Sequence, residues 1–362
     1  MDEINLRIPG PVPLPEETLQ LMAKQMMNHR GKEYAEMLDS MTKNLQTVLM
    51  TKSDVYFITA SGTGGMETAI VNTTSPGDKV LSISIGWFGE RFGEISDAYG
   101  CETIRLIFEY GEYADPDLVL NAILKNPDIK AVLITHNESS TGVKNPLEEI
   151  CKIVKENSNA LILVDAVSSA AGSIISTDAW GIDVVATASQ KSWIAPPGIA
   201  MISFSEDAWK AYDKSKCPKY YYDINQYKEY LNIGQPPFTP CLTTMYTLEY
   251  SLNKMVKEGI ENIFDRHSSI AKYVRNKAKS IGLEILPPEN YESDTVTAIK
   301  LPENVDGKKI VAEVSKKYNI VLGGGQQKLA GKIVRIGHMG WINIDDIESS
   351  IVALKETLEK NS

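Results

Sequence analysis

One lysine of this 362-residue chain stands where its amine could act as a nucleophile. Lys191 follows the β-branched run VVATASQ (184–190) and precedes the rigid turn APPG (195–198). Burial at a strand end disfavours the ammonium form, so it lowers the pKa of a lysine and frees the amine for covalent chemistry. The alternative is a solvated lysine in a loop, which is the commoner case. Lys191 therefore needs support from other residues.

A glycine-rich turn could supply an anion site. The stretch SGTGG (61–65) lies between the run VYFITA (55–60) and a helix that we expect to start near Met66. Glycines let the backbone approach a ligand, and free N–H groups at a helix start bind phosphate. An ordinary strand-to-helix turn is an equally good interpretation. The stretch is neither the dinucleotide motif G-x-G-x-x-G nor a Walker loop.

Two ionic side chains stand at further strand ends. Asp165 ends the apolar run ALILVDA (160–166), and open α/β sheets bind ligands at such ends. Alternatively, Asp165 caps a helix in the following AVSSAAG segment. Arg335 lies between Val334 and Ile336, where its guanidinium could pair with a carboxylate or face solvent.

One ligand, pyridoxal phosphate, would explain all four signals. Its phosphate suits the turn at 61–65, and its aldehyde suits Lys191. Its ring nitrogen suits Asp165, and the carboxylate of an amino-acid substrate suits Arg335. A lysine Schiff base with an acidic partner for the pyridinium is the signature of this cofactor.

The elements around these residues alternate between short apolar runs and longer amphipathic segments. Several of the runs are apolar throughout, as in strands covered on both faces; the runs are 55–60, 79–85, 102–108, 131–137, 160–166, 184–190 and 199–204. Such alternation predicts an α/β architecture with a mostly parallel sheet.

Both ends of the chain differ from this pattern. Four prolines predict an extended arm over residues 5–15, and helical patterning then continues to about Leu49. A helical stretch at 251–281 leads into short strands, a helix near 307–318 and a final helix at 344–360, which indicates a compact α+β domain. We predict an arm at 1–20, a large domain at 21–255 and a small domain at 256–362.

Composition narrows the functional classes. A net charge of −10 does not favour a nucleic-acid or anionic-membrane partner. The four cysteines form no C-x-x-C pair, so we expect neither a metal site nor a disulfide framework. The start is not a secretory signal, and no apolar run approaches transmembrane length. A cytoplasmic location is expected.

Together the motifs resemble the class V pyridoxal-phosphate-dependent aminotransferases, of the alanine–glyoxylate / serine–pyruvate aminotransferase group. The resemblance covers nearly the whole chain through PGPVPLPEE, SGTGGMETAIVN, GWFGER, THNESSTGV, LILVDAVSSAAG, TASQKSWIAPPGIAMISFS and KIVRIGHMG. It implies an aspartate-aminotransferase-like fold (pyridoxal-phosphate fold type I) with a seven-stranded large domain and a small C-terminal domain. It also implies a homodimer with active sites at the subunit interface.

The resemblance implies roles for single residues. Lys191 matches the Schiff-base lysine and Asp165 the partner of the pyridine nitrogen, so both are expected to be catalytic. Arg335 matches the arginine that binds the substrate carboxylate, and Gly10 lies in the arm that lines the substrate site. The remaining cofactor contacts are expected at Ser61, Gly62 and Thr63 of the phosphate turn, Phe88 stacked on the ring, Ser139 near the phenolic oxygen, Gln190 beside the phosphate, and Thr239 reaching it from the neighbouring subunit.

One segment departs from the family pattern. Where the family often has aromatic-His-His-Thr-x-Pro, residues 235–241 read QPPFTPC, so the usual tyrosine contact to the phosphate is missing. The resemblance implies that this segment also shapes the substrate pocket, so the departure bears on the alignment of Thr239 and on substrate identity.

We expect ping-pong transamination from a small amino acid, alanine or serine, to a 2-oxo acid, glyoxylate or pyruvate. Other reactions on the same fold are aspartate or aminophosphonate transamination and a cysteine desulfurase-type lyase. A desulfurase needs a mobile reactive cysteine in the C-terminal half, and the last cysteine of this chain is Cys241. A binding module without catalysis is a further alternative. So is a nucleotide-binding domain, which would leave Lys191 and Arg335 without a role.

Overall fold

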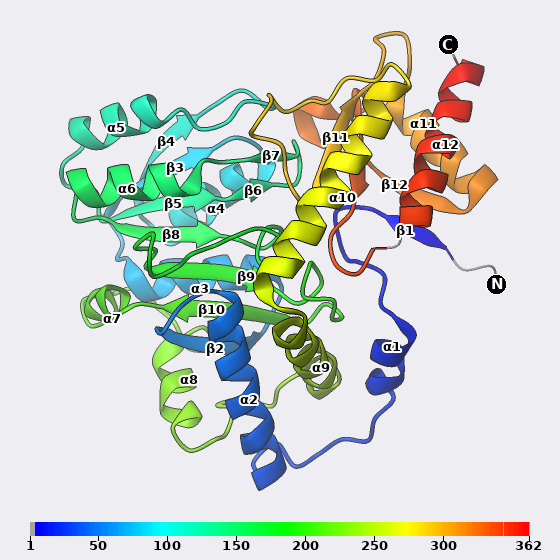
Figure 1. Cartoon of the computed structure of the whole chain (residues 1–362). Helices are drawn as coiled ribbons and strands as arrows, with labels where there is room; N and C mark the ends of the chain where they lie inside the picture. The colour runs from blue at the N-terminus through cyan, green and yellow to red at the C-terminus, as the bar shows by residue number, and fades with distance from the viewer. Residues whose placement is uncertain (1–3, 343, 362) are drawn as a thin grey trace.

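A seven-stranded sheet forms the centre of the molecule in the computed structural model, which describes residues 4–342 and 344–361 (Figure 1). Its strand order is β2-β10-β9-β8-β5-β3-β4, and only β10 runs antiparallel to its neighbours. The strands are β2 (Asp54–Thr59), β3 (Lys79–Ser84), β4 (Glu102–Ile107), β5 (Ala131–Thr135), β8 (Leu161–Asp165), β9 (Val184–Ala188) and β10 (Ile199–Phe204). The predicted α/β fold with a mostly parallel sheet is confirmed.

Helices cover both faces of this sheet, which is why its central strands are apolar throughout. In β5, for example, Val132 and Ile134 pack on one face and Leu133 on the other. The first face carries α2 (Lys32–Val48), α5 (Pro116–Lys125), α6 (Leu147–Asn157) and α9 (Leu242–Glu258). The second carries α3 (Gly62–Thr73), α4 (Trp87–Ala98), α7 (Glu206–Tyr212) and α8 (Ile224–Leu231).

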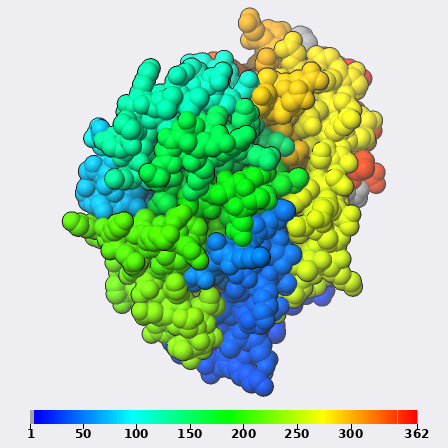
Figure 2. Space-filling model, turned by 60° about the vertical axis from the view of Figure 1, so that its left-hand side comes forward, coloured from blue at the N-terminus to red at the C-terminus, as the bar shows by residue number. Residues whose placement is uncertain are grey.

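A second, four-stranded sheet of order β1-β12-β13-β11 lies beside the large one (Figure 1). Its strands are β1 (Asn5–Arg7), β11 (Val296–Lys300), β12 (Ile320–Gly324) and β13 (Ile333–Gly337). Around it lie α10 (Ile260–Ser280), α11 (Gly307–Tyr318), the short 3₁₀ helix η1 (Gln327–Leu329) and α12 (Ile344–Asn361). Figure 2 shows the yellow part of the chain, which includes α10, lying along the green and blue parts of the surface.

The N-terminal arm crosses between the two sheets. β1 pairs with β12, and the chain then passes the end of β9, where the Val12 N–H donates to the Gln190 carbonyl at 3.1 Å. Helix α1 (Glu16–Met22) follows. The small hairpin β6 (Asn137–Glu138) and β7 (Val143–Lys144) completes the strands. The division at residues 20 and 255 stays a prediction.

Three helix predictions were wrong in their bounds. The helical patterning expected from Pro15 to about Leu49 forms two helices, with residues 23–31 between them; in this connection the Asn28 side chain accepts from the Arg30 N–H. The stretch expected at 251–281 is interrupted at Gly259, whose φ of +89° ends α9. The helix expected near Met66 starts at Gly62.

Candidate active site

A cavity of about 140 Å³ lies at the edge of the large sheet where β2, β5, β8 and β9 end. Five segments far apart in sequence line it: Ser61, Gly62, Thr63 and Met66; Phe88 and Arg91; Asn137 and Ser139; Asp165, Val167 and Ser168; Gln190 and Lys191. Three larger grooves, of about 740, 940 and 550 Å³, lie elsewhere and contain neither Lys191 nor Asp165. The small cavity is the candidate site because its side chains carry the chemistry.

Lys191 follows β9 and points into this cavity. Its amine donates to the backbone carbonyl of Pro9 in the N-terminal arm. Burial lowers the pKa of the Lys191 amine from 10.5 to about 8; Asp165 opposes that shift and Arg335 adds to it. The amine is therefore far easier to deprotonate near neutral pH than that of a surface lysine.

Asp165 ends β8, the strand between β5 and β9, and is only 3% exposed. Its Oδ1 accepts from the Val167 N–H at 2.9 Å, and its Oδ2 accepts from the Thr135 hydroxyl at 3.3 Å. Burial raises the pKa of this carboxyl from 3.8 to about 6. Residues 168–170 form turns rather than a helix, so Asp165 is not a helix cap.

Helix α3 begins at the cavity with backbone donors that its own turns leave free. Its first intrahelical bond runs from the Gly65 N–H to the Ser61 carbonyl. A Cβ at Gly62 would lie 2.5 Å from Val167 Cγ2, so only glycine fits there. Close by, the buried Gln190 Oε1 has no hydrogen-bond partner among the described residues. The free N–H groups at the start of α3 would donate to the oxygens of an anionic ligand group, and Gln190 Oε1 would accept from a hydroxyl on that group.

Phe88 is held over the cavity by a carboxylate that the sequence analysis did not identify. Glu138 Oε2 accepts from the Phe88 and Gly89 N–H groups at 3.0 and 3.1 Å, which belong to the second and third residues of α4. Its other oxygen, Oε1, accepts from the Ser140 N–H and hydroxyl. Burial raises the pKa of Glu138. The only sequence signal was that NESSTG and GWFGER each follow a strand.

Arg335 lies on β13, 6% exposed, but is not among the residues that line the described cavity. Its Nη1 donates to the Ser139 carbonyl at 2.7 Å and to Gln326 Oε1 at 3.0 Å, while Nε and Nη2 donate to the Gly324 carbonyl. Burial lowers the pKa of its guanidinium to about 10. The structure thus brings Arg335 against the backbone of a cavity residue, Ser139.

Gly10 packs directly on Lys191. A Cβ at Gly10 would come within 2.5 to 2.9 Å of the Cδ, Cε and Nζ atoms of Lys191, and its φ of +91° also requires glycine. By contrast, Thr239 and Cys241 lie outside the group that lines the described cavity. Thr239 is exposed, and Cys241 precedes α9 with its sulfur 3.1 Å from the Thr244 hydroxyl.

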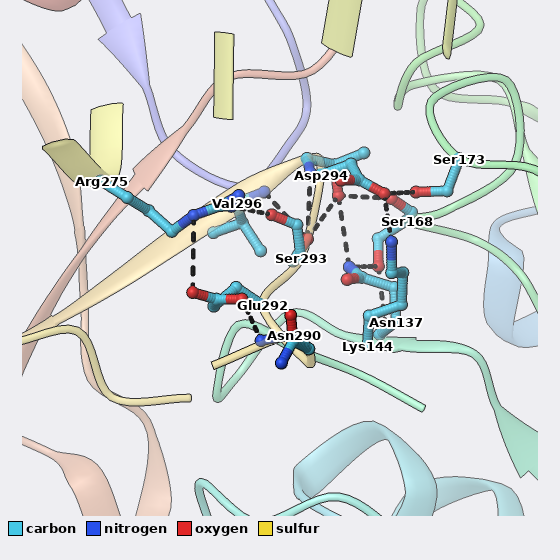
Figure 3. Close-up of polar contacts among 11 residues, drawn as sticks. Asn137, Lys144, Ser168, Ser173, Arg275, Asn290, Glu292, Ser293, Asp294 and Val296 are labelled. Carbon is cyan, nitrogen blue, oxygen red and sulfur yellow. Dashed lines mark hydrogen bonds and ion pairs between the residues drawn. The ribbon is translucent and has the colours of Figure 1, made fainter. Parts of the chain in front are cut away.

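A buried polar network connects the cavity wall to the segment before β11 (Figure 3). The Thr295 hydroxyl donates to the Ser168 carbonyl at 2.8 Å and lies 3.3 Å from Asn137 Nδ2. Asp294 accepts from Lys144 and Ser173 on the large-sheet side. Sequence reasoning missed Asn137 and Ser168 as cavity residues.

The site thus combines an amine with a lowered pKa, a buried carboxylate and an anion-binding helix start. These groups fit a planar ligand that carries an anionic group, a basic ring nitrogen and an electrophilic carbon. No helix in the described part of the chain is long and apolar enough to cross a membrane.

Known proteins match this chain over most of its length. The model of the family "Aminotransferase class-V" matches residues 16–344. An uncharacterized aminotransferase of Methanocaldococcus jannaschii is 42% identical, covering 98% of this chain and 92% of that protein. An L-aspartate–glyoxylate aminotransferase of Paracoccus denitrificans is 35% identical, covering 92% of this chain and 85% of that protein.

Solved structures agree with these matches. The crystal structure of an alanine–glyoxylate aminotransferase from Nostoc superposes with a TM-score of 0.95 at 28% identity, covering 99% of this chain and 96% of that one. The likeness therefore includes both sheets, the N-terminal arm and the candidate site.

Proposed function

Because the chain belongs to the class V aminotransferases, we propose that it moves an amino group from a small amino acid to a 2-oxo acid with pyridoxal phosphate bound at Lys191. Alanine or serine is the proposed donor, and glyoxylate or pyruvate the proposed acceptor. The observation that carries the proposal is that Lys191 and Asp165 line one cavity with the first turn of α3.

The residues present fit this cofactor. The start of α3 offers backbone donors to a phosphate, and Gly62 lets this turn pack against Val167, which a side chain there would strike. The orphaned oxygen of Gln190 can accept from a protonated phosphate or an ordered water. Phe88 lines the cavity, and the guanidinium carbon of Arg91, another lining residue, lies 5.0 Å from the centre of its ring.

Each proposed catalytic residue has a distinct task. When bound, the cofactor supplies an aldehyde that bonds covalently to amines and a ring that withdraws electrons from the substrate. Asp165 holds a proton at the ring nitrogen, since a carboxylate with a pKa of about 6 is mostly ionised near pH 7 and accepts that N–H. Lys191 takes the proton from the substrate Cα, for which an amine with a pKa of about 8 suits neutral pH.

Arg335 binds the substrate carboxylate and so orients the Cα–H bond toward Lys191. Its present partners are two backbone carbonyls and the Gln326 side chain. The carbonyls are fixed by the fold, so the carboxylate takes the place of Gln326 when substrate binds.

A half-reaction screen tests the proposal. The cofactor-loaded protein is mixed with one amino acid at a time, and the loss of the absorbance of the lysine-bound cofactor is followed while the oxo-acid product is measured. Alanine or serine is expected to give the fastest loss, and Lys191→Ala to form no oxo acid. Normal turnover by Lys191→Ala, or sulfide release from cysteine in place of an oxo acid, would contradict the proposal.

The proposal extends to a cytoplasmic homodimer in which Thr239 completes the partner's phosphate site. Thr239 is exposed here, and Leu19, Met22 and Met26 of the arm region are exposed apolar side chains. The four cysteines are free, as suits a reducing compartment. We expect light scattering to give twice the 40.0 kDa chain mass and Thr239→Ala to weaken cofactor binding; a monomer with full activity would contradict both.

A further inference from the structure

Two cysteines from distant parts of the sequence lie against one hydroxyl group. Cys101 precedes β4 and donates its thiol proton to Thr74 Oγ1 at 3.4 Å, and Cys217 Sγ lies 3.9 Å from the same oxygen. Thr74 follows α3 and donates its own proton to the Ile70 carbonyl at 2.9 Å. The two sulfur atoms can therefore be no farther apart than the first two distances combined.

The backbone segments that carry the two thiols also pack together. Cys217 Sγ lies 4.0 Å from the Tyr99 carbonyl, and the Lys216 N–H donates to Ser75 Oγ at 3.0 Å. Residues 213–223 connect α7 to α8 and contain neither helix nor strand. A disulfide needs a sulfur–sulfur distance of about 2.05 Å, and a local shift of this connection would bring Cys217 to that distance.

A groove of about 740 Å³ gives access to the same connection. Ser215 and Lys216, which precede Cys217 in the chain, line the groove. Ser75, which follows Thr74, lines it as well. The two cysteines themselves are only 9% and 4% exposed. A small reagent in the groove would thus lie one or two residues along the chain from the thiols.

The groove is basic although the whole chain has a net charge of −10. Its lining includes two aspartates, Asp78 and Asp207, and five lysines, namely Lys130, Lys155, Lys210, Lys214 and Lys216. Lys155 pairs with Asp183, and Lys210 pairs with Asp207. The other three lysines form no ion pair with any residue that the structure describes. Like charges gathered in one groove favour an anionic ligand.

We propose that Cys101 and Cys217 are a redox-active pair that forms an intramolecular disulfide, and that the oxidant is an anionic disulfide of low molecular weight attracted by the lysine groove. The inference does not depend on the proposed function. Both thiols are free in the structure, which corresponds to the reduced form. The bond forms when the ratio of disulfide to thiol around the protein rises.

The reaction is a thiol–disulfide exchange in two steps. The thiolate of Cys217 attacks one sulfur of the oxidant, whose S–S bond breaks and releases a thiolate that takes up a proton. The thiolate of Cys101 then attacks Cys217 Sγ in this mixed disulfide and releases the second thiol. Two cysteine S–H bonds thus give one S–S bond, while two electrons reduce the oxidant to two thiols. Burial raises the pKa of the Cys217 thiol, so the reaction is expected to become faster above neutral pH.

The new bond would join the start of β4 to the connection after α7, across the end of α3. It would close a long loop of the chain and so restrict the unfolded state. The oxidised protein is therefore expected to unfold at a higher urea concentration than the reduced protein.

The test exposes the full-length protein to glutathione disulfide, which is anionic, blocks the remaining thiols and identifies the linked peptides by mass. The wild type is expected to give a Cys101–Cys217 cross-link that a reductant removes, together with the rise in the urea midpoint. Cys101→Ser is expected to carry one glutathione at Cys217, without a cross-link and without that rise. Cys151→Ser removes a fully buried thiol and Cys241→Ser a half-buried one, and both controls are expected to keep the cross-link.

The role of the lysines is tested with a second oxidant of opposite charge. Cystamine is a cationic disulfide, so at low salt it is expected to form the cross-link about tenfold more slowly than glutathione disulfide. Added salt should reduce this difference, because it screens exposed charges. Lys214→Gln combined with Lys216→Gln should reduce it as well.

The outcomes decide each part of the proposal. A wild type whose thiols stay free, or bind glutathione without a cross-link, overturns the pair. A cross-link between other cysteines does the same. Equal rates with the two oxidants at low salt overturn the role of the groove. If Cys101→Ser does not fold, the mapping of the wild type and of Cys151→Ser decides the matter. Because no cofactor is measured, none of these outcomes bears on the proposed function.

Discussion

At the scale of single residues, the amine of Lys191 depends on a neighbour that has no side chain. Gly10 has a φ of +91°, and a Cβ there would lie 2.5 Å from Lys191 Cδ and 2.8 Å from Nζ. A methyl group at this position would have to move either the lysine or the arm. A side chain at Gly10 would therefore have two effects: it would strain the backbone, and it would displace the amine of Lys191.

Gly10→Ala is expected to reduce kcat/KM about 100-fold, because a displacement of about 1 Å in a reacting group has an effect of that size. The backbone strain should also lower stability by about 1–2 kcal/mol. Steady-state kinetics and urea unfolding measure the two effects. Gly77→Ala is the matched control, since Gly77 has a φ of +86° but open space around its Cβ position. Equal kinetic losses in both variants would show that strain alone is responsible.

The sequence was informative about residues whose type alone carries the chemistry. Lys191, Asp165 and the SGTGG turn stand at strand ends, and the parallel sheet brings these ends together in one cavity. Asn137 and Thr295 could not be paired in this way. They are 158 positions apart, and an asparagine or threonine near a strand end has too many ordinary uses to be chosen from sequence.

At the scale of elements, the position of α4 depends on one buried carboxylate. Glu138 accepts four hydrogen bonds, two from the start of α4 and two from Ser140. Its charge also lies at the positive end of the helix. Phe88 is the second residue of α4, so whatever fixes this helix start also fixes the ring that faces the cavity.

Glu138→Gln is expected to lower the free energy of unfolding by about 1.5–3 kcal/mol and to weaken cofactor binding. The amide nitrogen of glutamine must face either the two α4 donors or the two Ser140 donors, so one pair is lost. Urea unfolding and a cofactor titration measure the two effects. Glu94→Gln changes an exposed residue of the same helix and is expected to stay within about 0.5 kcal/mol of wild type. Unchanged unfolding of Glu138→Gln would contradict the capping role.

Elements were predictable where burial decides the pattern. Each of the seven runs became a strand of the large sheet, and the four whose residues are all buried, β5, β8, β9 and β10, are covered on both faces. Helix bounds were less predictable. The helical period does not register where a helix stops, as at Gly259, whose φ of +89° ends α9, or at Met22, where α1 ends although helical patterning continues.

At the scale of the whole molecule, buried contacts join the two sheets and their helices. One joint is His267 of α10, which is 1% exposed. Its Nδ1 lies 2.7 Å from the Ile263 carbonyl and must donate to it, so Nε2 is the acceptor for the Gly340 N–H at 3.0 Å. This bond ties α10 to the loop that follows β13. It requires a neutral imidazole.

Acid should therefore weaken the molecule through His267. Burial lowers the pKa of this histidine from 6.5 to about 4, so the unfolded chain takes up a proton below pH 6.5 that the folded chain does not bind until about pH 4. The stability contributed by neutral His267 is complete above pH 6.5 and is lost as pH falls toward 4. Between pH 7 and pH 5 this loss is about 2 kcal/mol.

His267→Gln cannot titrate, and its Oε1 can still accept from Gly340, so the wild type should lose about 2 kcal/mol more than the variant in urea unfolding at the two pH values. Parallel losses in both proteins would show that this joint does not sense protons.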